Sequence, residues 1–280
     1  MSPIHDQGYR RYGGQRTPPG RAWSVIAKAG IRTLLAKRAF IGLLIMAWLP
    51  FVVRTVQIYA ATSLPQAAFL APDARMFRQF LEQQEVFLFF ITIYAGAGLI
   101  ATDRRANALQ IYLSKPLSRV EYIFGKFTIL AAFLLLVTWV PAVFLLIIQI
   151  VISGSFKFFI DNLFLFPAIT IFSFIQVAAV AFAMLALSSL SNSSRYVGIL
   201  YTALIFFSQA LYGIVYAITR DSRLGWISIA ADLNRIGDAI FNVPTRFALS
   251  VPLAAIAVVA LMAASALVLE KRVRGVEVVA

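Results

Sequence analysis

Long apolar runs separated by short polar segments dominate the pattern along this chain. A helix needs about 20 apolar residues to cross the hydrocarbon core of a bilayer. Six runs approach or exceed this length, and we predict membrane-spanning helices over residues 39–60, 85–102, 123–152, 163–190, 196–218 and 247–269. The predicted fold class is therefore all-α, with a single polytopic transmembrane domain over residues 39–280.

The second run is short, and its helix is expected to begin upstream. Asp73 follows Pro72 and has the position of a helix N-cap, which predicts an extracytoplasmic helical extension over 73–85. Arg78 lies four residues before Glu82, a spacing that pairs the two side chains on one helical face.

Residues 1–20 are rich in Gly, Pro, Arg and Tyr and show no apolar periodicity. Such a segment buries too little apolar surface to offset its chain entropy, so we predict a disordered cytoplasmic leader. A cleaved signal peptide is the alternative. It is disfavoured because the apolar run from Ala39 is longer than the signal core of about 7–15 residues.

Residues 21–38 have the pattern of an amphipathic helix. Its basic positions Arg21, Lys28 and Arg32 lie opposite an apolar side. That side is made of Trp23, Ile26, Ala27, Gly30 and Leu34. We predict a helix lying in the membrane interface. The alternative is a solvated helix packed on protein.

Composition excludes a water-soluble fold. The chain is 61% hydrophobic and 13% charged with a mean hydropathy of +0.83, whereas soluble domains are about half apolar and about a quarter charged. It has no cysteine, and its one histidine is His5 in the leader. Disulfides, thiolate chemistry and His/Cys metal sites are therefore excluded, and no metal site is predicted.

The net charge of +13 could indicate a nucleic-acid ligand, but the distribution of the charged residues is that of a membrane protein. With the N-terminus inside, the cytoplasmic segments hold 17 Lys and Arg against 5 acids, and the outer segments hold 7 of each. Cytoplasmic loops of membrane proteins carry such an excess. We predict that both termini are cytoplasmic, that the lipid bilayer is a partner, and that no nucleic acid is bound.

The predicted spans contain few ionisable groups in their interiors, namely Arg54 and, at the entrance of the third, Lys126. An ion-coupled carrier usually places such a group near the midplane, so the coupling energy is expected to come from elsewhere. Arg54 is expected to extend to the headgroups, with a substrate contact as the alternative.

The loop from Asp103 to Phe127 carries the strongest local signals. Apolar spacing predicts a short helix from Arg104 to Leu113, which Pro116 ends. Ser118-x-x-Glu121 is a capping box that starts a new helix, and Leu117 and Tyr122 have the spacing of a hydrophobic staple. The pattern predicts a stiff helix, turn and helix leading into the third span. A well-capped connecting loop is the alternative.

This loop resembles the first cytoplasmic loop of the membrane subunits of ABC exporters of the type-2 permease class. The matching residues are Asp103, Leu113, Ser114, Lys115, Pro116, Leu117, Ser118, Arg119, Tyr122, Gly125 and Lys126. Ala106-Asn107 departs from the small pair, such as Gly-Thr, that many relatives have. The resemblance implies that this is the coupling helix seated on an ATPase subunit. The implied coupling residues are Asp103, Arg104, Arg105, Leu109, Tyr112, Leu113, Lys115, Pro116, Ser118, Arg119 and Glu121.

The resemblance further implies the permease subunit of an ATP-driven exporter, working as a dimer, expected to be a homodimer, in a bacterial inner membrane. The sequence lacks a G-x-x-x-x-G-K-[ST] phosphate loop, so the chain is not expected to be an enzyme or to bind a cofactor. ATP and Mg would be bound by a separate ABC ATPase subunit. The alternative is a membrane scaffold or assembly factor that docks a soluble partner through the same loop.

Residues 219–246 are too polar to span and too apolar for a plain linker. Trp226, Ile229, Leu233, Ile236 and Ile240 follow helical spacing, opposite a face with Arg235 and Asp238. We predict outer helices that either roof a substrate path, as the resemblance implies, or lie in the interface with Trp226 at headgroup level.

Uncharged polar and small residues within the spans have two interpretations. Gln149, Gln176 and Gln209 are candidates for the substrate path, although interhelical hydrogen bonds are their commoner role. Small residues let helices approach closely in lipid, and packing within the chain is expected for them. They are Ala179 and Ala183 in the fourth span and Ala257, Ala260 and Ala264 in the sixth.

Overall fold

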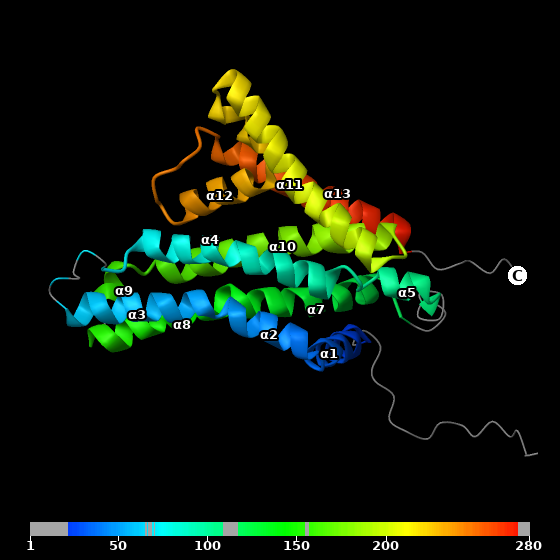
Figure 1. The fold of residues 1–280 in the computed structure, drawn as a ribbon, viewed down its shortest axis with the longest axis horizontal. Coiled ribbons are helices and arrows are strands. Elements are labelled where there is room, and N and C mark those ends of the chain that lie inside the picture. Colours follow the sequence, from blue (N-terminus) through cyan, green and yellow to red (C-terminus); the bar gives the residue numbers. More distant parts are fainter. Residues whose placement is uncertain are drawn as a thin grey trace, which may run out of the picture.

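The computed structural model describes residues 22–64, 66, 69, 71–108, 117–154 and 157–273, and these contain helices and no strand (Figure 1). The predicted leader over 1–20 lies outside them. Six helical segments are long and apolar enough to cross a membrane. They are Arg38–Ser63, Ala74–Arg105, Arg119–Ser153, Leu165–Leu190, Ser194–Thr219 and Val251–Arg272. The predicted six-span, all-α fold is thereby confirmed.

Three of the six spans are broken into shorter pieces. The first is α2 (Arg38–Ala47) and α3 (Leu49–Ser63), the second is α4 (Ala74–Ile91), the π-helix η2 (Thr92–Gly96) and α5 (Ala101–Arg105), and the third is α7 (Arg119–Val137) and α8 (Trp139–Ser153). Pro50 and Pro141 follow two of these breaks, where a missing N–H interrupts the helical hydrogen bonds. At the first break, buried Gln84 Nε2 donates to Ala47 O at 3.0 Å.

The remaining spans are continuous helices. They are α10 (Leu165–Leu190), α11 (Ser194–Thr219) and α13 (Val251–Arg272). Short elements lie between the spans: α9 (Lys157–Asp161), the 3-10 helix η3 (Ser222–Ile227) and α12 (Ile229–Ile240). One further helix, α1 (Ala22–Leu35), precedes the first span.

Helix α10 is the centre of the bundle. In its most apolar window 67% of the residues are buried, against 17% in the first, fifth and sixth spans. Ala179 and Ala183 are both buried, as predicted. The prediction for α13 is wrong, because Ala260 and Ala264 are exposed and Ala254 and Val258 face the core instead.

The second span begins where the sequence predicts. Asp73 Oδ1 accepts a hydrogen bond from Met76 N at 2.9 Å, so Asp73 is the N-cap of α4 and the extension over 73–85 is helical. The predicted pairing of Arg78 with Glu82 is wrong. Arg78 pairs with Asp238 and Glu82 with Arg246, because neighbouring elements offer closer carboxylate and guanidinium partners than the same helix does.

Helix α1 packs against α7 through its predicted apolar side. Ala27 and Leu34 are buried, and Trp23 meets Phe124 edge to face at 5.0 Å between ring centroids. A Cβ on Gly125 would lie 3.0 Å from Trp23 O, so glycine permits the close approach of the two helices. The helix therefore packs on protein, and its position in a membrane interface stays a prediction.

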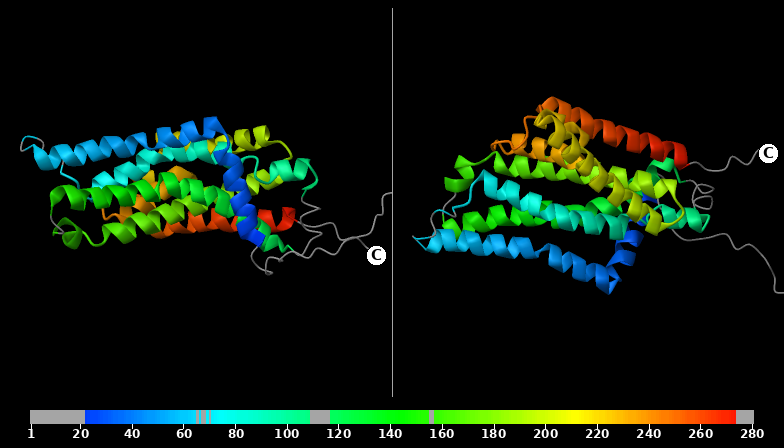
Figure 2. Two further views of the ribbon diagram at one scale, coloured as in Figure 1. Left: turned by 90° about the horizontal axis from the view of Figure 1, so that it is seen from below. Right: turned by 45° about the horizontal axis from the view of Figure 1, so that its top comes forward.

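The two ends of the bundle are formed by different helices. Helices α1 and α5 and the last turns of α13 gather at one end, and α9 and the end of α3 lie at the other (Figure 1). Figure 2 shows α1 lying across the long helices rather than along them. The end with α1 and α5 is the one that the charge distribution predicts to be cytoplasmic.

Candidate functional site

The predicted coupling segment begins at the end of α5. Helix α5 ends at Arg105, and Asn107 has a left-handed φ of 52° that ends the helical run. The predicted continuous helix from Arg104 to Leu113 is therefore interrupted at Ala106–Asn107. Asn tolerates this backbone region better than most residues, which gives the departure at Ala106-Asn107 a physical reason. Leu109, Tyr112, Leu113, Lys115 and Pro116 lie outside the described residues.

The capping box that starts α7 is confirmed. Glu121 N donates to Ser118 Oγ at 3.2 Å, and Ser118 N donates to Glu121 Oε2 at 3.1 Å. Leu117 packs against the same apolar cluster as Tyr122, as the staple predicts. Two otherwise unpaired N–H groups are satisfied, so the third span begins with a fixed first turn.

Asp103 joins the two helices that flank the coupling segment. Its Oδ2 accepts a hydrogen bond from the Tyr122 hydroxyl at 2.7 Å and pairs with Lys126 Nζ at 2.7 Å. The Tyr122 side chain is fully buried, and Lys126 and Asp103 are 12% and 16% exposed. We call Asp103, Tyr122 and Lys126 the α5–α7 bridge. It connects the two ends of the segment directly.

Helix α10 holds the same end of the second span. Ser188 Oγ accepts hydrogen bonds from Ile100 N and Ala101 N, both at 3.1 Å, and donates to Ala97 O at 2.9 Å. Arg104 Nη1 donates to Ser189 O. These contacts satisfy the backbone where the helix is broken between η2 and α5, and they tie the coupling segment to the central helix.

The predicted coupling residues therefore divide into two groups. Asp103 and Arg104 bond to other helices of the chain, whereas Arg105 and Arg119 are exposed. Ser118 is exposed and bonds within its own capping box. Tyr122 and Lys126 were recognisable in the motif but were not predicted as site residues. Ser188 has no sequence signal, since its role depends on the packing of α10 against the second span.

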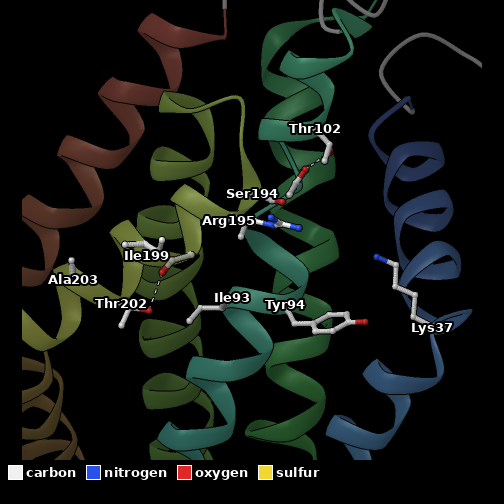
Figure 3. Close-up of a pocket in the computed structure, with 12 residues that line it drawn as sticks. Lys37, Ile93, Tyr94, Thr102, Ser194, Arg195, Ile199, Thr202 and Ala203 are labelled. Atoms are coloured by element: carbon white, nitrogen blue, oxygen red, sulfur yellow. Dashed lines mark hydrogen bonds between the residues drawn. The ribbon is translucent and has the colours of Figure 1, made fainter.

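A lateral cavity of about 770 Å³ opens beside the second span (Figure 3). Its walls come from the corner before α2, from η2 and the residues after it, and from the first turns of α11. The lining residues are Lys37, Ile93, Tyr94, Ala97, Gly98, Thr102, Ser194, Arg195, Gly198, Ile199, Thr202 and Ala203. Its wall includes the π-helix η2, a helical form that frequently occurs at functional sites.

The cavity has cationic groups at one end. Figure 3 shows Arg195 next to Ser194, on the side of Thr102, with Ile199 beside it. Lys37 stands across the cavity from the level of Tyr94 with its amine directed toward the side of Arg195, and Ile93 and Ala203 lie further along. Lys37 Nζ lies 5.7 Å from the centroid of the Tyr94 ring, a cation–π distance. Thr202 Oγ donates to Gly198 O at 2.9 Å, so this hydroxyl proton is not free to bond to a ligand in the cavity.

The three glutamines predicted for a substrate path do not line this cavity. Gln149 and Gln176 are 5% and 1% exposed, and Gln176 Nε2 donates to Glu85 Oε1 at 3.5 Å. Gln209 is exposed, and its Oε1 accepts from Ser228 Oγ at 2.5 Å, joining α11 to the start of α12. Gln176 and Gln209 therefore have the interhelical role that the sequence analysis gives as the commoner one.

Arg54 also differs from its prediction. Its side chain is only 9% exposed, and its guanidinium donates to Gln57 Oε1 at 2.7 Å and to Gln79 Oε1 at 3.5 Å. It lies against α3 and α4 instead of extending to the headgroups, because Gln57 and the exposed Gln79 supply acceptors there.

Helix α12 covers the outer part of the bundle. Leu233 and Ile236 are buried as predicted, and Trp226 is 47% exposed on the separate helix η3. Asp238 was expected on the polar face, but it is 2% exposed and pairs with Arg78. A Cβ on Gly237 would lie 2.6 Å from Arg78 Nε, so glycine makes room for the guanidinium.

Metal-ligating clusters are absent from the described part of the chain, which contains no group of three or more His, Asp or Glu placed to hold a metal. Comparison with known families gives one match. Residues 24–230 match the model of a family described as ABC-2 family transporter protein, a range that runs from α1 into the start of α12. No curated protein matches the chain.

Proposed function

Because the chain belongs to the ABC-2 family of transporter proteins, we propose that it forms the substrate path of an ATP-driven exporter together with a second copy of itself. A permease role in a membrane follows from the family and the six spans. The proposal adds a separate ABC ATPase subunit, which binds ATP and Mg, and a place in a bacterial inner membrane.

The observation that carries the coupling proposal is the α5–α7 bridge. A displacement of the segment between α5 and α7 would reach both spans, because Asp103 bonds to Tyr122 and Lys126 on α7. It also reaches α10 through Arg104 and Ser189. A flexible connector would absorb such a displacement. This arrangement supports the coupling role over that of a simple connecting loop.

The exposed cations Arg105 and Arg119 are the proposed contacts to the ATPase. They flank the coupling segment on the side that the charge distribution predicts to be cytoplasmic. Charged groups at the rim of an interface steer association and fix its register. Reversing these two charges should therefore weaken docking without disturbing the bridge beneath them.

The proposed dimer would use the spans that this chain leaves uncovered. Only 17% of the residues are buried in the most apolar windows of the first, fifth and sixth spans. The fifth span and Lys37, just before the first span, line the lateral cavity, so a second copy on this face would enclose it. Lipid covers whatever part of these helices the second copy leaves free.

The test is co-purification with candidate ABC ATPase subunits co-expressed with this chain, followed by Mg-dependent ATP hydrolysis in proteoliposomes. We expect a stable complex, no hydrolysis by this chain alone, and weaker complex formation for Arg105→Glu/Arg119→Glu. Lys271→Glu/Arg272→Glu is the matched control, since it reverses two exposed charges at the end of α13. An intact complex in the first variant would refute this docking site. A complex whose ATPase rate never responds to cargo would favour the scaffold function.

A further inference from the structure

We propose that the lateral cavity binds an anionic amphiphile, with a phosphate headgroup held between Lys37 and Arg195 and acyl chains along Ile93, Ile199 and Ala203. This inference rests on the proposed function, because it names the class of cargo that the path accepts. Three features of the cavity support it: its charge, the change of polarity along its lining, and the backbone geometry of its walls.

The charge of the cavity favours an anionic ligand. The ion pairs among the described residues are Arg78 with Asp238, Lys126 with Asp103, and Arg246 with Glu82. Neither cation of the cavity takes part in one, and none of the described residues that line the cavity is acidic. Two positive charges therefore face one space without a carboxylate to neutralise them, which favours an anionic ligand.

The orientation of Lys37 and Arg195 also supports a ligand placed between them. Figure 3 shows the Arg195 guanidinium extending from α11 toward the side from which Lys37 approaches. The two residues come from opposite walls, so a ligand between them would contact both. Arg presents a planar fork and Lys a compact charge, and both are common phosphate ligands.

The lining of the cavity changes from charged to aliphatic side chains, which supports a ligand with both a charged and an apolar part. Away from Ser194 and Arg195 the lining includes the aliphatic side chains of Ile93 and Ala203, and Ile199 lies beside Arg195 (Figure 3). Ile199 is 62% exposed in the single chain, so it can bury apolar surface against a ligand. A soluble anion would use only the cationic end, whereas an amphiphile would use both.

Backbone geometry holds the cationic end in place. Lys37 O accepts hydrogen bonds from Phe40 N at 3.0 Å and Ile41 N at 3.2 Å, which fixes the corner between α1 and α2. Arg195 lies in the first turn of the 26-residue helix α11, whose N-cap Ser193 makes no side-chain cap. The free N–H groups and the dipole of this helix add a positive potential at the same end.

The test uses the purified full chain in an uncharged maltoside detergent, without the ATPase. The probe is a fluorescent short-chain phosphatidate, compared with the matching diacylglycerol and with inorganic phosphate as competitors. Losing charge-assisted hydrogen bonds from two cations should raise the Kd for phosphatidate at least tenfold in Lys37→Gln/Arg195→Gln. Lys271→Gln/Arg272→Gln is the control and should leave the Kd unchanged.

A second variant tests the apolar end and keeps the charges. Ala203→Trp fills that end and should weaken the binding of phosphatidate while retaining the elution profile of the folded chain. The proposal is overturned if Lys37→Gln/Arg195→Gln binds phosphatidate normally, or if the control variant weakens binding equally. Inorganic phosphate competing as well as phosphatidate would assign the site to a soluble anion and would also overturn it. Because no ATPase is present, these results are independent of the coupling test.

Discussion

Arg78 Nε donates a hydrogen bond to Asp238 Oδ1 at 3.1 Å, which ties the start of the second span to α12 across 160 residues of sequence. Both side chains are 2% exposed. The guanidinium also donates to Asn234 and lies 4.9 Å from the Phe172 ring centroid. This buried pair holds the outer covering element α12 against α4 and α10.

Removing one member of the Arg78–Asp238 pair should destabilise the chain strongly. Arg78→Gln leaves a buried carboxylate without its counter-ion, a loss that typically costs about 3–5 kcal/mol. Arg246→Gln is the control, since the Arg246–Glu82 pair is largely exposed and such pairs contribute about 0–1 kcal/mol. Thermal unfolding in detergent measures both. Arg78→Met/Asp238→Leu should recover part of the loss, and equal small effects of both single variants would contradict the expectation.

Weakening the capping box should uncouple ATP hydrolysis from transport. Ser118→Ala/Glu121→Ala removes a cap that typically contributes about 0.5–2 kcal/mol, which is small beside the packing of six spans. We expect normal expression and dimer assembly but lower cargo-stimulated ATP hydrolysis in reconstituted complexes. Full coupled activity in this variant would mean that the turn is only a connector.

The α5–α7 bridge should be tested with a change of one atom. Tyr122→Phe keeps the buried ring and removes the hydroxyl that donates to Asp103, an effect of about 0.5–1.5 kcal/mol on stability. We expect binding of the ATPase to persist while transport per ATP hydrolysed falls. Tyr196→Phe, an exposed tyrosine on α11, is the control. Equal transport per ATP in the two variants would exclude the bridge from coupling.

The orientation of the chain can be tested by single-cysteine labelling, because the sequence contains no cysteine. Arg105→Cys should react with an impermeant maleimide only after the membrane is opened, and Arg223→Cys should react in intact cells. Both side chains are exposed, so lack of reaction would reflect sidedness rather than burial. The reverse pattern would invert the topology.

Stability should depend on the protonation of Asp232 on α12, outside the six spans. Burial raises the pKa of Asp232 from 3.8 to about 8. The folded chain therefore holds this proton more tightly than the unfolded chain does, so the stabilisation is complete below about pH 4 and is lost as the pH rises toward about 8. Asp232→Asn should flatten the decline of the unfolding temperature over this range. Parallel curves for the variant and the parent chain would show that Asp232 does not titrate there.

Features that depend on residues adjacent in the chain can be predicted without the folded structure. The lengths of the apolar runs predicted six spans, Asp73 predicted the start of α4, and Ser118 and Glu121 predicted the start of α7. These signals are local, because a cap bonds to N–H groups two or three residues away and a span is a continuous run. The loop motif likewise indicates the family without knowledge of any tertiary contact.

Contacts between groups that are distant in the sequence are visible in the folded chain alone. Arg78 bonds to Asp238 instead of Glu82, Asp103 bonds to Tyr122 and Lys126, and Ala260 faces outward rather than into the bundle. Helical spacing places a residue on a face of its own helix, but it does not say which neighbour that face contacts. The partner depends on how the helices cross and on where glycines such as Gly125 and Gly237 permit close approach. For the same reason the cavity between Lys37 and Arg195, which lie on separate helices far apart in the sequence, exists only in the folded chain.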